Sequence, residues 1–205
     1  MKTTLAILAL MSIGFSPPSE SGEKVAAKPA SRAPAADLPA LNREVLAFAR
    51  DHLGKQVGNG ECATLAAAAL RKAGARRFPL NRADGDYVWG RPIESFRDAL
   101  PGDLLQFRDA VFQGKTRVSS HQSIVWRYGY THHTAVIAEV RDKGALVTIL
   151  QQNVGDEATS EERKKRVQEG TLRPASLKKG GKVWIYRPVG PDEPIDEPPP
   201  PKAAD

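Results

Sequence analysis

Cys62 is the only cysteine of the 205-residue chain, and its surroundings are those of a nucleophile. A glycine-rich turn, 58–61, precedes it, and a strongly helical run, 63–73, follows it. This order places the sulfur at a helix N-terminus, where the helix dipole and the free N–H groups favour thiolate over thiol. A lone cysteine cannot form an intramolecular disulfide, which leaves an intermolecular bridge, a reactive thiol or an inert buried one. The setting suggests a thiol hydrolase.

Such an enzyme also needs an imidazole within hydrogen-bond reach of the sulfur. Of the four histidines, His52 fits the polar edge of a helix and His121 lies in a Ser/Gln-rich loop. The other two, His132 and His133, open a predicted strand over 133–140 and point to opposite faces of it, because strand side chains alternate. We predict that His133 is the base.

A third group must orient the imidazole, and the next predicted strand ends in suitable side chains. Gln151 and Asn153 share a face there, while Gln152 points away. An amide oxygen can orient the ring and fix its tautomer without adding charge. Either Gln151 or Asn153 could take this role; polar residues that merely close a strand are the alternative.

The elements that must position these residues follow a simple order. Two helices are predicted, over 41–53 and 62–73, with Gly54 and Gly74 at their ends. Residues 75–100 are irregular. Four short strands follow, over 104–107, 133–140, 145–150 and 183–186. Helices first and antiparallel strands afterwards indicate an α+β fold, with the helices packed on an antiparallel sheet.

Several segments resemble a known superfamily. They include Tyr-Val-Trp-Gly at 87–90, Pro-Gly-Asp-Leu-Leu-Gln-Phe at 101–107 and His-His-Thr-Ala-Val-Ile at 132–137, beside 54–62 and 185–189. In order and spacing they are similar to the papain-like cysteine hydrolases of the NlpC/P60 and CHAP kind. They resemble in particular the cysteine-proteinase-fold domain at the C-terminus of fungal myosin-tail-interacting proteins. The resemblance covers about residues 41–189 and implies a papain-like, NlpC/P60-like fold.

The resemblance also implies roles for single residues. Cys62 would be the nucleophile, His133 the base, and Gln151 or Asn153 the orienting group. Gln56, six residues before Cys62, matches the position of an oxyanion-hole glutamine, although an exposed polar turn residue is an equal alternative.

Two departures from the superfamily's pattern stand against these roles. Gln151 stands where CHAP enzymes often have a carboxylate, and Glu61 beside the sulfur would raise its pKa. The alternative function is a catalytically weak or inactive binding domain on the same fold.

Composition divides the chain into four parts. Residues 1–19 form an apolar segment typical of a signal peptide, 20–39 a Pro/Ala-rich linker, 40–189 the folded domain, and 190–205 an acidic Pro-rich tail. The leader predicts export, which makes the protein secreted or periplasmic.

Charge and residue content limit the partners. The formal net charge is +6, yet the basic runs lack the aromatic interleaving of a nucleic-acid platform, so no nucleic acid is expected. One cysteine and two adjacent histidines do not give tetrahedral ligand spacing, and neither a metal nor another cofactor is expected. We expect a monomer without a transmembrane span that acts on a peptide or a cell-wall amide.

Overall fold

Two helices form one layer in the computed structural model, which describes residues 37–80 and 84–194. They are α1 (Ala40–Asp51) and α2 (Cys62–Lys72), which confirms both predicted helices to within two residues at each end. The predicted signal peptide, most of the linker and the last residues of the tail lie outside the described part. Among the described residues, no helix is long and apolar enough to cross a bilayer.

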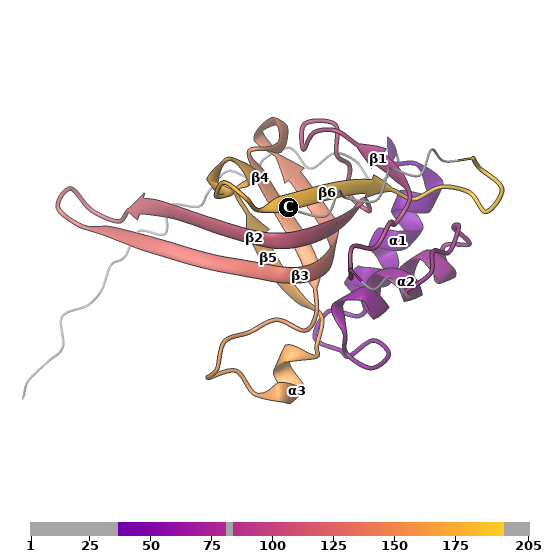
Figure 1. Cartoon of the computed structure of the whole chain (residues 1–205), viewed down its shortest axis with the longest axis horizontal. Coiled ribbons are helices and arrows are strands. Elements are labelled where there is room, and N and C mark those ends of the chain that lie inside the picture. The colour runs from indigo at the N-terminus through magenta and orange to yellow at the C-terminus, as the bar shows by residue number, and fades with distance from the viewer. Residues whose placement is uncertain (1–36, 81–83, 195–205) are drawn as a thin grey trace, which may run out of the picture. The chain divides into compact units, whose positions relative to one another are not determined.

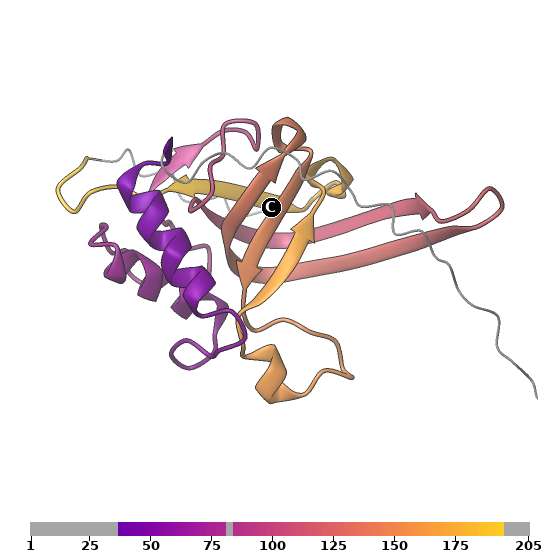
Figure 2. The same cartoon turned by 180° about the vertical axis from the view of Figure 1, so that it is seen from behind.

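The second layer is one six-stranded sheet in the order β1-β6-β2-β3-β4-β5, with every neighbouring pair antiparallel (Figures 1 and 2). The observed architecture confirms the predicted α+β class. A one-turn helix α3 and two short 3-10 helices, η2 and η3, lie in the connections. The bounds are β1 Arg91–Ile93, β2 Leu104–Arg117, β3 Ser123–Arg141, η2 Asp142–Gly144, β4 Leu146–Gln151, α3 Glu161–Lys164, β5 Gln168–Leu172, η3 Pro174–Ser176 and β6 Lys182–Arg187.

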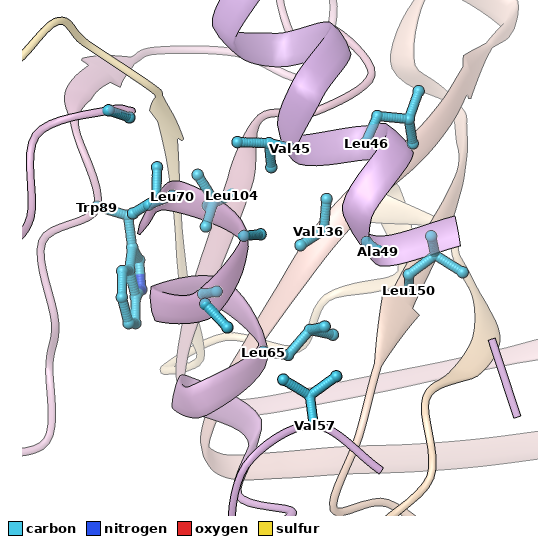
Figure 3. Packing of buried hydrophobic residues seen from close by; sticks show 14 of the residues in the cluster. Val45, Leu46, Ala49, Val57, Leu65, Leu70, Trp89, Leu104, Val136 and Leu150 are labelled. Carbon is cyan, nitrogen blue, oxygen red and sulfur yellow. The ribbon is translucent and has the colours of Figure 1, made fainter. Parts of the chain in front are cut away.

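Both faces of the sheet are buried, and each belongs to its own apolar cluster. Figure 3 shows Val45 of α1 and Leu65 of α2 packed with Val136 of β3 on the helix-covered face. Ala135 and Ile137, the neighbours of Val136 along β3, lie in the second cluster on the other face. Strand alternation produces this division over 135–138, where each residue lies on the face opposite to its neighbour.

β2 and β3 are much longer than predicted, because they continue past the rest of the sheet (Figure 1). β2 pairs with β6 only as far as Arg108, whereas its pairing with β3 runs on to the Arg117–Ser123 pair. We call residues 113–127, the outer part of this two-stranded ribbon, the arm. Its strands were missed because polar and small residues interrupt the apolar alternation that identifies a strand.

An ion-paired turn, 101–103, joins α1 to the sheet. Asp103 is fully buried, and its carboxylate accepts hydrogen bonds from the Leu100 backbone N–H, from Asn42 Nδ2 and from the Arg187 guanidinium, at 2.7–3.1 Å. This arrangement gives Asp103 a structural role. Residues 190–194 also contact the domain, since Arg91 pairs with Glu193 at 3.1 Å.

Candidate active site

Cys62 is the first residue of α2, as predicted, and its thiol is partly buried against β3. Burial raises the pKa of the thiol and the nearby Glu61 charge raises it further, while hydrogen bonds with Thr134 and with the Ala63 backbone N–H lower it. The net effect is an upward shift, because burial is the largest of these influences. Burial thus opposes the thiolate that the helix terminus is expected to favour.

The thiol opens into a cleft of about 280 Å³ between the start of α2 and the sheet. His132 borders this cleft together with Cys62 and Thr134. Its other bordering residues come from the turn before α2, from α2 itself, from the segment before β1, from β2 and β3, and from the segment after β4: Glu61, Ala63, Gly85, Tyr87, Gln106, His133 and Asn153.

His132 lies on the face of β3 that meets Cys62. It is two residues from Thr134, so the two side chains point to the same side of the strand. Nδ1 of His132 is 3.9 Å from Oδ1 of Asp86, a buried carboxylate that Arg108 holds through contacts of 2.8 and 3.0 Å. Burial raises the pKa of Asp86, and the Arg108 charge opposes that shift. The structure thus supplies a histidine with a carboxylate behind it.

His133 pairs with Gln151, as its predicted role requires, but its ring lies on the opposite face of β3. Nε2 of His133 is 2.9 Å from Gln151 Oε1, and the ring stacks on Tyr130 with 4.6 Å between centroids. It also lies 5.8 Å from the ring of Phe107, a member of the cluster on the face away from the helices. Burial lowers the pKa of His133 to about 4, and the bond to Gln151 opposes that shift.

Of the two remaining predicted site residues, one borders the cleft and the other does not. Asn153 reaches the cleft and donates from Nδ2 to Oε2 of Glu61 at 2.7 Å, so it orients the carboxylate beside the sulfur. Gln56 is exposed and donates from Nε2 to the Gly58 carbonyl at 3.0 Å. Gln56 is absent from the described residues that border the cleft, an arrangement that matches the alternative of a polar turn residue.

Two buried glutamines that received no role in the sequence analysis hold the site together. Gln152 is fully buried; its Oε1 accepts from the Val57 N–H at 3.2 Å, and its Nε2 donates to the carbonyls of Val57 and Glu61 at 3.0 and 2.7 Å. It therefore fixes the turn that leads into Cys62. The available signal was its place next to Gln151 on the opposite face of the strand. The predicted shared face of Gln151 and Asn153 is wrong, because β4 ends at Gln151 and Asn153, with a φ of 62°, reaches Glu61 on the cleft side.

Gln106 performs the same task on the other side of the cleft. Its Oε1 accepts from Trp89 Nε1 at 3.1 Å and from Thr134 Oγ1 at 2.9 Å, and its Nε2 donates to the Gly85 carbonyl at 3.0 Å. The position of Thr134 against the thiol is thereby fixed. A single polar residue within the apolar run 104–107 was the available signal.

The arrangement is suited to acyl transfer at a thiol. The sulfur, an imidazole with a carboxylate behind it, and the first N–H groups of α2, which have no partner within the helix, meet at one cleft. Within residues 37–80 and 84–194, no group of three or more His, Cys, Asp or Glu side chains is placed to hold a metal ion.

Comparison with known proteins agrees with the fold. Residues 38–196 match the family model described as the AIM3/BBC1 cysteine proteinase-fold domain. Neither the curated proteins nor the solved structures searched gave a match. The family match spans most of the chain, and the α+β architecture with a cysteine opening the second helix accords with it. The chain therefore belongs to the AIM3/BBC1 cysteine proteinase-fold domain family.

Proposed function

We propose that the protein is a cysteine hydrolase that cleaves an amide or related acyl bond, with Cys62 as nucleophile and His132 as base. The observation that carries this proposal is the shared cleft. Cys62 of α2 borders it with both histidines, and His132 lies on the same side of β3 as Thr134, which contacts the thiol. The placement favours His132 over His133, since the ring of His133 is engaged on the other face with Gln151. Asp86, whose Oδ1 is 3.9 Å from His132 Nδ1, would stabilise the imidazolium through its charge.

The thiol reacts from its protonated form in this mechanism. As Cys62 Sγ bonds to the substrate carbonyl carbon, its proton passes to His132, and the imidazolium then protonates the leaving amine as the C–N bond breaks. Water attacks the resulting thioester and gives its proton to His132. The C–S bond breaks, the acid product leaves, and the proton returns to the sulfur. The Cys62 N–H group at the start of α2 supports the oxyanion.

The substrate class follows from the superfamily resemblance and from the predicted leader. We propose export, with a cell-wall peptide as the amide that is cleaved, and a monomeric enzyme whose cleft is complete within one chain. The N-terminal sequence of the protein recovered from its native source tests the leader. Sedimentation equilibrium of the purified chain tests the monomer.

An activated ester tests the chemistry before the substrate is known. Mixing the chain with p-nitrophenyl acetate should give a burst of p-nitrophenolate and an acetyl group on Cys62, followed by slow turnover. Cys62→Ser should abolish the burst. His132→Gln should slow acylation and deacylation by on the order of a hundredfold or more, the usual contribution of general base catalysis. His121→Gln, in the exposed turn of the arm, is the matched control.

The second candidate is a binding domain without turnover, and one observation favours it. A hydroxyl and a backbone group of Thr134 contact the thiol, and burial raises its pKa. This alternative predicts that Cys62 is acetylated no faster than a free cysteine of the same pKa and that His132→Gln leaves that rate unchanged. That pair of results would overturn the hydrolase proposal.

A further inference from the structure

The arm projects from the domain as a ribbon of two strands, β2 and β3, outside the sheet formed with β6 and β4 (Figures 1 and 2). Its pairs run from Gln113–Arg127 to Arg117–Ser123, and the chain turns over at 118–122. An isolated two-stranded ribbon is only marginally stable in water. Pairing of the two strands alone therefore does not account for the length of the arm, and its side chains indicate a further role.

One face of the arm is an aromatic and aliphatic stripe. Tyr128, Trp126 and Ile124 follow one another on this face, because strand residues two apart point the same way. The rings of Trp126 and Tyr128 stack with 5.7 Å between centroids, and Trp126 lies over Gly114, where a Cβ would come within 2.3 Å of the indole. The inner end of the stripe joins the core through Phe112, which stacks on Tyr128 at 5.3 Å.

The outer end of the arm exposes aliphatic side chains to solvent. The described residues include five exposed large hydrophobic side chains, and three of them lie at this end: Val118, Ile124 and Val125, with 50%, 53% and 64% of their surfaces exposed. The turn between them, 119–122, is polar but carries no Asp, Glu, Lys or Arg. Ile124 lies on the face of the stripe and Val125 on the opposite face, because neighbouring strand residues alternate. Exposed apolar side chains gathered at one end of a ribbon in this way indicate an interaction site.

Basic side chains that form no ion pair with any carboxylate that the structure describes lie near this apolar end. Lys115, Arg117 and Arg127 are exposed, and among the described residues none of them has an ion-pair partner. From residue 110 to residue 138 the sequence contains no Asp or Glu. The partner that complements the arm is therefore anionic.

We propose that the arm is a membrane-surface anchor that inserts its apolar end into the interface of an anionic lipid bilayer. Val118, Ile124 and Val125 would enter the acyl boundary, and Trp126 would lie at the headgroup level, where amphipathic rings accumulate. Lys115, Arg117 and Arg127 would meet the lipid phosphates. A soluble polyanion would satisfy the cations and leave the aliphatic end in water. A second copy would cover the aliphatic end but would bring six cations together.

Vesicle flotation of the full chain tests the anchor. Vesicles with about a third phosphatidylglycerol should carry the protein, and phosphatidylcholine vesicles should carry much less. Each arm cation near an anionic surface contributes about fivefold to the partition coefficient, so K115Q/R117Q/R127Q should weaken binding about 100-fold. The control R43Q/R71Q/K72Q removes the same charge from exposed positions on the two helices and should bind like the wild type.

Trp126 reports insertion directly and separates the arm from the N-terminal apolar segment, which could itself bind vesicles. Lipids brominated on the acyl chain should quench Trp126 fluorescence, and Trp126→Phe should remove that quenching, since the chain's other tryptophans are Trp89 and Trp184. V118T/I124T/V125T keeps the strand-forming β-branched shape and should reduce both the quenching and the flotation.

Three results would overturn the proposal. The first is flotation with no quenching of Trp126. The second is equal competition by a soluble polyanion such as dextran sulfate, with no effect of the threonine substitutions. The third is a concentration-dependent dimer, seen without vesicles, that the same substitutions dissociate.

Discussion

His133 and Gln151 form a buried pair on the face of the sheet away from the helices, with Nε2 of His133 2.9 Å from Gln151 Oε1. An amide oxygen only accepts, so the proton is on Nε2. The ring packs against Tyr130 and Phe107, and neither can stabilise an added positive charge as water does. His133 is therefore a neutral core residue, and its burial should lower the stability of the fold at acid pH.

The free energy of unfolding should fall between pH 6.5 and about 4, because burial lowers the pKa of His133 to about 4 from its ordinary 6.5. As the pH falls through this window the unfolded chain takes up a proton at His133 and the folded chain does not. The contribution is therefore fully present above pH 6.5 and is lost as the pH falls, by at most roughly 3 kcal/mol. Urea unfolding at several pH values measures it.

His133→Asn keeps a partner for Gln151 and removes the titrating group. The difference in stability between wild type and this variant should shrink steadily below pH 6.5, whereas the exposed His121→Gln should follow the wild type. Parallel loss of stability in wild type and His133→Asn would contradict this account of the buried imidazole.

The alkylation of Cys62 should be slow at neutral pH. Burial raises the pKa of the thiol above its ordinary value of 9.0, so the thiolate that reacts with iodoacetamide forms only at higher pH. Glu61 raises the same pKa through its charge, and Glu61→Gln should therefore shift the rate profile to lower pH. With a single cysteine in the chain, mass spectrometry follows the reaction without background.

Glu44→Gln is the control for this shift, since it removes an equal charge from an exposed position on α1. A profile with its midpoint well below 8, in wild type or in Glu44→Gln, would show instead that the helix terminus outweighs burial.

The helices and the position of Cys62 could be predicted from sequence because their signals are local. Apolar residues recur at helical spacing in α1, and Gly54 and Gly74, which follow the two helices, have φ of 76° and 69°, as glycine readily adopts. β5 lacked such a signal, since Gln168–Leu172 contains a single aliphatic residue and is placed by its pairing with β4.

Which of the two histidines faces Cys62 could not be predicted from sequence, for a physical reason. Alternation separates His132 from His133, but Ala135 and Val136 are both apolar because β3 is buried on both faces. Which face meets α2 depends on tertiary packing. Asp86 could not be predicted as a site residue either. It comes from a segment with no periodicity and approaches His132 only in the folded chain.

Asp103→Asn should destabilise the fold by about 3–5 kcal/mol, the usual cost of removing one partner of a buried ion pair. Its carboxylate is fully buried and pairs with Arg187, at 2.9 Å between Oδ2 and Nη2. Arg91→Gln is the contrasting variant. The side chains of its pair with Glu193 are 56% and 40% exposed, so its loss should cost less than about 1 kcal/mol. Equal effects of the two variants in urea unfolding would contradict the structural role of Asp103.

Gln152→Leu should destabilise the fold and loosen the turn before the nucleophile. The substitution removes the acceptor of the Val57 N–H, whereas the carbonyls of Val57 and Glu61 keep the Thr64 hydroxyl as a donor. An unsatisfied buried polar group costs about 1–3 kcal/mol, so a loss of about 1–3 kcal/mol is expected in urea unfolding. Under native conditions the alkylation of Cys62 should become faster, because the turn that helps to bury the thiol loses its anchor.

Gln56→Leu is the matched control, since it removes an exposed amide whose one hydrogen bond stays within the same turn. It should change stability by less than about 1 kcal/mol and leave the alkylation rate unaltered. It also tests the oxyanion role suggested by the family resemblance. If Gln56→Leu lowers the acetylation rate of Cys62 while stability is unchanged, the Gln56 amide swings into the cleft during acylation. If the rate is unchanged, the Cys62 N–H group at the start of α2 is sufficient.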